Sequence, residues 1–191
     1  MKSKIFLLVL FLLATKDTTA QIMFERIYGG VDADWGVSVQ STSDSGYIAT
    51  GGSFSYGDGS NDVYLLKTDK YGNELWHKTY GGNGYDIGIA VKQTMDGGYI
   101  ITGSTSSYGA GSSDVYLIRT DALGDTLWTR TFGGAEDDAG YSVIENNDGS
   151  LLIVGNTLSF AVGFSAAYVI KTDENGNLLW QKSYEKSGTS R

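Results

Sequence analysis

The stretch that decides the fold reads DVYLLKTD at residues 62–69. It returns 52 residues later as DVYLIRTD at residues 114–121, and again in drifted form as AAYVIKTD at residues 166–173. Trp76, Trp128 and Trp180 share this spacing. So do the glycine pairs of YGG (residues 28–30 and 80–82) and FGG (residues 132–134). A period held at so many positions indicates three copies of one structural unit.

Each unit contains four short strand-like runs separated by turn residues. In the second unit the expected strands are residues 88–94, 99–105, 115–120 and 126–132. The segments between them carry Asp-Gly and Gly-Gly pairs, which suit the positive φ angles of tight hairpins. The unit is therefore predicted to be a β-meander.

The strand runs lack a clean alternation of apolar and polar residues, which indicates sheets buried on both faces. A propeller blade lies between two neighbours and has this property, and its repeats are four-stranded and about 40–50 residues long. The sequence thus predicts an all-β fold of propeller-type repeats in residues 21–184. Its three blades span about residues 29–80, 81–132 and 133–184, followed by a tail at 185–191. A β-solenoid and a single β-sandwich remain as alternatives.

A further copy of the last strand precedes the first unit, because residues 23–30 align with residues 75–82 at the same period. Three blades fall below the usual 4–8 of a closed ring. We therefore expect three blades plus one extra N-terminal strand, arranged as an open arc or partial propeller. Its two end faces would be apolar, so self-association or a longer parent chain is expected.

Residues 1–20 have the pattern of a secretory signal peptide. A short basic start is followed by an apolar run from Ile5 to Ala14, and a polar region ends in small residues at Ala20. An apolar run of this length is too short for a transmembrane helix. The chain is expected to be secreted, to the cell exterior or surface or to the periplasm, with no membrane span.

The composition is acidic and free of cysteine and proline, with a formal net charge of −8. Removing residues 1–20 would leave 11 basic and 21 acidic residues, a net charge near −10. Such a surface disfavours nucleic acid as a partner. The absence of cysteine means that packing alone must stabilise the exported domain.

No catalytic, cofactor or metal site is expected. The single histidine, His77, occupies a variable strand position, so histidine-based nucleophilic and zinc chemistry lacks its usual groups. Asp34, Asp86 and Asp138 recur once per unit, which indicates a structural turn or cap. The loop at Asp58 resembles a calcium loop only in the first copy, so it is interpreted as a solvated turn.

The aromatic residues divide into two groups. Trp76, Trp128 and Trp180 recur once per unit, so they are interpreted as packing between adjacent blades. Tyr56, Tyr85 and Tyr108 lie in irregular loops, and we predict them as the candidate surface residues for binding a partner.

The repeat resembles the bacterial, seven-bladed-propeller-like repeat of secreted and surface proteins, especially those of Bacteroidota. The resemblance rests on Asp86, Gly88 and Val91, on the DGGY and DVYL segments at residues 96–99 and 114–117, and on Leu-Trp followed by Tyr/Phe-Gly-Gly. It covers residues 24–184. It implies a propeller fold and export, in some members through type IX secretion, but no single ligand.

Together these features predict an exported, non-catalytic module, a scaffold for binding a protein or glycan. The alternative is a carbohydrate-active enzyme or its accessory domain, since glycosidases need only two carboxylates.

Overall fold

The computed structural model describes residues 24–185, whose regular structure consists of twelve β-strands and no helix. The first sheet contains β1 (Asp34–Ser41), β2 (Tyr47–Ser53), β3 (Asp62–Thr68) and β4 (Glu74–Tyr80). The second contains β5 (Asp86–Gln93), β6 (Tyr99–Thr105), β7 (Asp114–Thr120) and β8 (Thr126–Phe132). The third contains β9 (Asp138–Glu145), β10 (Leu151–Thr157), β11 (Ala166–Thr172) and β12 (Leu178–Tyr184). Within residues 24–185 no helix could cross a membrane.

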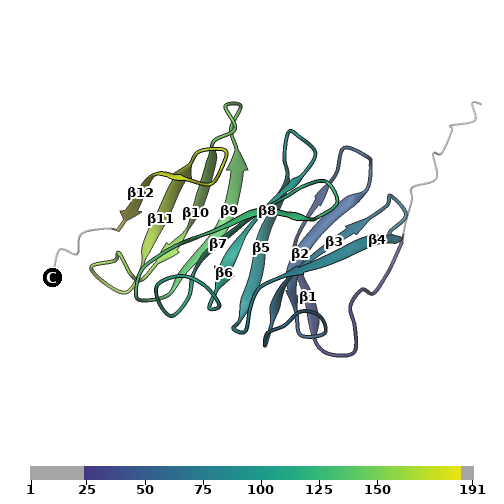
Figure 1. The fold of residues 1–191 in the computed structure, drawn as a ribbon, viewed down its shortest axis with the longest axis horizontal. Coiled ribbons are helices and arrows are strands. Elements are labelled where there is room, and N and C mark those ends of the chain that lie inside the picture. The colour runs from purple at the N-terminus through teal and green to yellow at the C-terminus, as the bar shows by residue number, and fades with distance from the viewer. Residues whose placement is uncertain (1–23, 186–191) are drawn as a thin grey trace, which may run out of the picture.

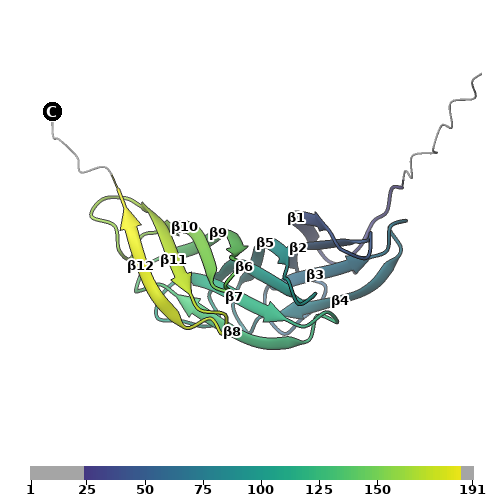
Figure 2. The ribbon, with the colours of Figure 1, turned by 90° about the horizontal axis from the view of Figure 1, so that it is seen from above.

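Each sheet is an antiparallel meander whose strands pair in chain order. The three sheets lie side by side, with the first sheet at one end of the molecule and the third at the other (Figure 1). They follow an open curve, along whose concave side the first strands β1, β5 and β9 lie (Figure 2). The prediction of an all-β fold with three four-stranded blades in an open arc is thus confirmed. We call the sheets blades 1, 2 and 3.

Turn residues set the strand ends close to where the sequence placed them. In blade 2 the turn between β5 and β6 contains Gly97 at φ +90°, a conformation that strongly favours glycine. The carboxylate of Asp96 accepts hydrogen bonds from Thr94 Oγ1 at 2.7 Å and from the Gly98 amide at 3.1 Å. In this blade each observed strand end lies within two residues of the expected one.

The core lies between the blades. The third strands of blades 1 and 2, β3 and β7, are buried at every position. One apolar cluster joins blade 1 to blade 2 and includes Leu65, Tyr80 and Tyr99. A second joins blade 2 to blade 3 and includes Leu117 and Phe132. Each blade therefore depends on its neighbour to cover its faces.

The expected extra N-terminal strand is not a strand: residues 24–30 have no strand assignment. Its counterparts β4 and β8 pair with the third strands of their own blades. The segment nevertheless keeps the packing of a last strand. Phe24 contacts Tyr47 with ring centroids 5.9 Å apart, as Trp76 contacts Tyr99 at 5.8 Å.

The expected signal peptide, residues 1–20, lies outside the described residues, as does the tail after Glu185.

Candidate functional site

The repeated aspartates tie the segment before the first strand of each blade to the loop after its second strand. Asp34, Asp86 and Asp138 begin β1, β5 and β9. Each accepts a hydrogen bond from a glycine amide four residues earlier, at 2.8–2.9 Å, and from a serine hydroxyl 21 residues later, at 2.6–2.7 Å. The arrangement serves each blade separately and brings no two of these three aspartates onto a common substrate position.

The loop between β2 and β3 uses its carboxylate internally. Asp62 Oδ2 accepts a hydrogen bond from the Gly59 amide at 3.1 Å. Burial raises the pKa of the Asp62 carboxyl, and the negative charge of the nearby Asp86 raises it further. Among the described residues, no group of three histidine, cysteine or acidic side chains could hold a metal ion.

The repeated tryptophans have different surroundings in the three blades. Trp76 and Trp128 are half-buried against the clusters on either side of blade 2. Trp180 is 38% exposed, because no fourth blade covers it within the described residues. His77, beside Trp76, has Nδ1 2.7 Å from Glu74 Oε1 and its ring 4.6 Å from that of Tyr56.

Two of the three predicted surface tyrosines occupy a repeated position. Tyr56 stacks on Tyr64 at 5.9 Å, and Tyr108 packs on Tyr116 at 5.8 Å. Phe160 repeats the contact on Tyr168 at 5.6 Å in blade 3. The hydroxyl of Tyr108 also donates to the Gly81 carbonyl at 2.6 Å, across the junction of blades 1 and 2. Both tyrosines thus contribute to the framework.

Tyr85 belongs instead to an aromatic cluster that occurs once. Its ring lies 6.4 Å from that of Phe54, which lies 5.6 Å from that of Trp35. Tyr85 and Phe54 are 43% and 46% exposed. The three residues come from the β4–β5 loop, the end of β2 and the start of β1. We call them the aromatic cluster.

The aromatic cluster departs from the repeat. The positions 52 residues after Trp35, Phe54 and Tyr85 hold Ile87, Ser106 and Asp137. A residue that shapes the blade should recur in each blade, so these three are free to serve another purpose. Sequence reasoning selected Tyr85 as a surface residue and did not select Trp35 and Phe54. The available signal was their departure from the repeat.

A buried amide adjoins the aromatic cluster. Asn61 is fully buried and donates through Nδ2 to the Asp86 carbonyl at 2.5 Å. Its Oδ1 has no hydrogen-bond partner among the described residues. A Cβ on Gly52 would lie 2.7 Å from the Trp35 ring and 2.8 Å from Asn61 Oδ1, so indole and amide flank this glycine. The cluster therefore has an unsatisfied acceptor beside it.

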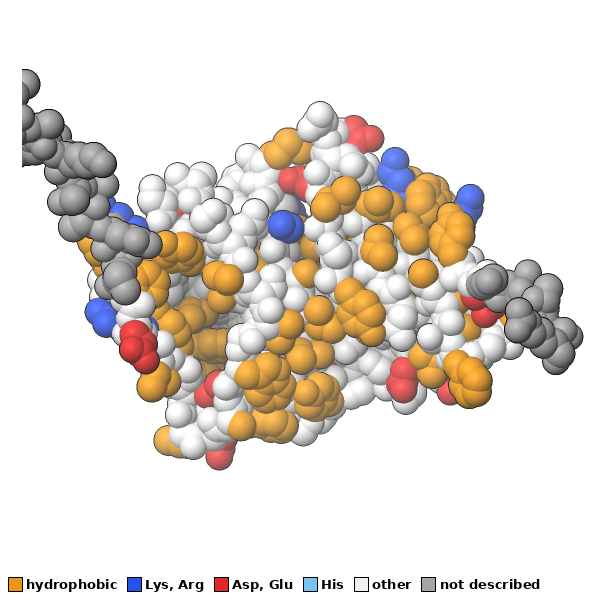
Figure 3. All heavy atoms as spheres, turned by 180° about the vertical axis from the view of Figure 1, so that it is seen from behind, with side chains coloured by type: hydrophobic (Ala, Val, Ile, Leu, Met, Phe, Trp, Pro, Cys, Tyr) orange, Lys and Arg blue, Asp and Glu red, His pale blue; other side chains and the backbone are white. Residues whose placement is uncertain are grey.

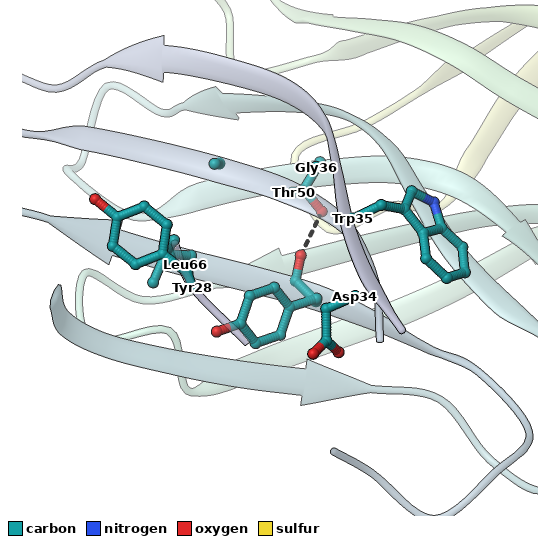
Figure 4. Close-up of a pocket in the computed structure, with 8 residues that line it drawn as sticks. Tyr28, Asp34, Trp35, Gly36, Thr50 and Leu66 are labelled. Atoms are coloured by element: carbon teal, nitrogen blue, oxygen red, sulfur yellow. Dashed lines mark hydrogen bonds between the residues drawn. The ribbon is translucent and has the colours of Figure 1, made fainter. Parts of the chain in front are cut away.

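A cavity of about 190 Å³ opens on the outer side of blade 1. It is lined by Tyr28, Asp34, Gly36 and Leu66, among others, and the Thr50 hydroxyl beside it donates to the Tyr64 carbonyl at 2.9 Å (Figure 4). The Trp35 indole points away from the Asp34 carboxylate in this view (Figure 4). Apolar side chains surround a hollow at the same end of the molecule (Figure 3).

No family model matches this chain. The chain is 28% identical over 114 residues to a protein named regulatory protein FlaEY from Caulobacter vibrioides. The match covers 53% of this chain and 12% of that protein.

Proposed function

We propose that the protein is an exported, non-catalytic binding scaffold that holds a partner protein or glycan at or outside the cell surface. The aromatic cluster carries the proposal, because its rings pack on one another, Phe54 and Tyr85 are exposed, and blades 2 and 3 do not repeat the group. The signal-peptide pattern at residues 1–20 supports export.

Large rings on a rigid framework supply contact area at low entropic cost, and aromatic residues dominate the energetics of many interfaces. The rings are inclined to one another by 49° between Trp35 and Phe54 and by 66° between Phe54 and Tyr85. A flat sugar face stacks best on one open ring face, whereas this uneven surface suits apolar side chains. The geometry thus favours a protein segment as the partner.

The acidic surface narrows the choice of partner further. With a formal net charge of −8, the chain would attract basic proteins over long range and repel acidic polymers. A basic protein that presents apolar side chains would be attracted by the acidic surface and would pack on the aromatic cluster. Because long-range attraction is screened by salt, its association rate should fall as ionic strength rises.

The test is capture of partners by the chain from residue 21 to 191, using secreted proteins of the source cell and a glycan array in parallel. Phe54→Ala and Tyr85→Ala should each weaken capture at least tenfold, about 1.4 kcal/mol or more. Tyr71→Ala is the matched control, since Tyr71 is similarly exposed but lies in the β3–β4 turn at the opposite end of the blade.

Equal losses from all three variants, or from none, would contradict the assignment of the aromatic cluster. Glycan capture that depends on Phe54 and Tyr85 would keep the site and change the class of partner. Measured turnover of any glycan would contradict the non-catalytic part of the proposal.

A further inference from the structure

Blades 1 and 3 each leave one broad face without a neighbouring blade in the described part of the chain. The free face of blade 3, the last face, contains Ile144, Val154, Trp180 and Tyr184. The free face of blade 1, the first face, contains Val39, Tyr47, Ala49 and Leu66 and lines an apolar hollow with Phe24 and Tyr28. Both faces repeat surfaces that contact each other inside the chain.

The last face is a copy of surfaces buried elsewhere in the molecule. Tyr184 is 55% exposed, whereas Tyr80 and Phe132 at the same repeat position are each 8% exposed. The two buried residues pack on the blade that follows them. The surface that would cover Tyr184 is therefore a face of another blade that corresponds to the first face of blade 1.

The first face is the matching copy. Val39 is 68% exposed, whereas Val91, its counterpart in blade 2, is buried against blade 1. A Cβ on Gly88 would collide with Thr50 of blade 1, and one on Gly140 with Thr102 of blade 2. A Cβ on Gly36 would meet nothing within 4 Å. This position of blade 1 has the space that another blade fills at the other two junctions.

Going beyond the proposed function, we propose that the last face of one copy of this chain packs on the first face of a second copy. The contact joins two different surfaces, so it must either close into a ring or continue as a filament. Propeller rings hold about 4–8 blades, and six is the one multiple of three in that range. Two copies would thus form a six-bladed ring with two identical junctions.

Polar groups at the internal junctions show how the new junction would be made. Lys78 Nζ of β4 lies 2.8 Å from Asp125 Oδ1 in the β7–β8 turn. Arg130 Nη2 of β8 donates to the Asn175 carbonyl in the β11–β12 turn at 3.0 Å. Lys182 of β12 holds the same repeat position. It would reach the β3–β4 turn of the second copy.

The segment from Phe24 to Tyr28 occupies part of this junction. The Tyr28 hydroxyl donates to the Gly72 carbonyl at 2.7 Å, as the Tyr80 hydroxyl donates to the Gly124 carbonyl at 2.6 Å. Tyr184 of a second copy would need the same Gly72 carbonyl. Because residues 24–30 form no strand ladder, while β12 pairs along β11, the N-terminal segment is the one that leaves. It therefore opposes association.

The experiment is sedimentation of the chain from residue 21 to 191 between about 1 and 100 µM, with three variants. The native chain should dimerise at the upper concentrations. Combining Phe24→Ala with Tyr28→Ala should lower the dimer dissociation constant at least tenfold, and Trp180→Ala should raise it at least tenfold. Leu123→Ala, an exposed change in the β7–β8 turn away from both faces, should leave it unchanged. Circular dichroism checks that each variant is folded.

Monomers at every concentration in both the native chain and the Phe24/Tyr28 variant would overturn the proposal. So would assemblies larger than a dimer, weaker association after the Phe24/Tyr28 change, or dimers insensitive to Trp180→Ala. None of these outcomes depends on the aromatic cluster, so a failed partner-capture experiment leaves this proposal standing, and the reverse also holds.

Discussion

At the scale of single residues, the repeated tryptophan shows how a side chain's contribution to the free energy of unfolding depends on the presence of an adjacent blade. Trp128 packs against the cluster between blades 2 and 3, while Trp180 faces open space. Trp128→Ala should lower the free energy of unfolding by about 3 kcal/mol, because it removes a packed aromatic ring. Trp180→Ala should change it by about 0.5 kcal/mol or less, as an exposed substitution does.

Urea denaturation measures the free energy of unfolding of both alanine variants, at a protein concentration low enough to keep the chain monomeric. Equal losses would show that the ring acts within its own blade, and the packing between blades would then not explain its recurrence.

Single carboxylates also set the response to acid. The hydrogen bond from Lys67 holds the pKa of Asp44 well below its usual value, and Thr42 and Gly46 act in the same direction. Asp148 also has a lowered pKa, because Ser150 donates to it. A carboxylate whose pKa is lowered by folding stabilises the protein above its unfolded pKa and loses that contribution as pH falls.

Thermal melts should therefore be constant from neutral pH to about pH 5 and fall in midpoint below about pH 4. Asp44→Asn should lower the midpoint at pH 7 and flatten the decline at low pH. A variant that melts with the same acid slope as the native chain would contradict the role given to Asp44.

At the scale of strands, glycines in β1, β5 and β9 record whether a blade lies alongside. A Cβ on Gly88 would meet Thr50 and would lie 3.0 Å from Val63, whereas one on Gly36 meets nothing. Gly88→Ala should cost about 1–3 kcal/mol through overpacking. Gly36→Ala should be neutral or stabilising by up to about 1 kcal/mol, because alanine restricts the unfolded chain.

Chemical denaturation of the two glycine variants, again as monomers, gives this comparison. A large loss from Gly36→Ala would mean that a backbone requirement of the first strand, and not blade contact, explains the repeated glycine.

Local turn chemistry explains why the strands were predictable and the N-terminal segment was not. Asp96, Gly97 and Gly98 fix a hairpin with groups that are adjacent in sequence, so the sequence locates it. Residues 24–30 have the pattern of a last strand, but a strand needs a partner, and these residues pair with no strand among residues 24–185. The sequence pattern predicts the side-chain packing of Phe24 and Tyr28, but it does not show whether the segment forms hydrogen bonds to a neighbouring strand.

The candidate site was predictable only in part for a related reason. Tyr85 stood out because it lies in an irregular loop. Trp35 and Phe54 lie at the edges of strands and are separated from it by tens of residues, and only the fold brings their rings together. Repetition marks the framework, so we expect a binding site among the residues that break the repeat and not among those that keep it.

At the scale of the whole molecule, stability should follow the order of the blades. Substantial contacts between sheets join blade 1 to blade 2 through β5, and blade 2 to blade 3 through β9. Such a stack behaves approximately as a sum of repeat and interface terms. Blade 2 has two interfaces, while blades 1 and 3 have one each in the monomer.

Amide hydrogen exchange of the monomer should therefore be slowest in β6 and β7 and fastest in β12, with β4 in between. The comparison of β8 with β12 is matched, since both are last strands with the same pairing, but β8 has a blade on its far side and β12 is exposed along its length. Mass spectrometry of peptides from these strands measures the difference. Equal protection of β8 and β12 would show that the three blades open together, and the sum of independent interfaces would then be the wrong description. If two copies do associate, raising the protein concentration should slow exchange in β12 and leave β6 unchanged, because β12 lies at the new junction and β6 does not.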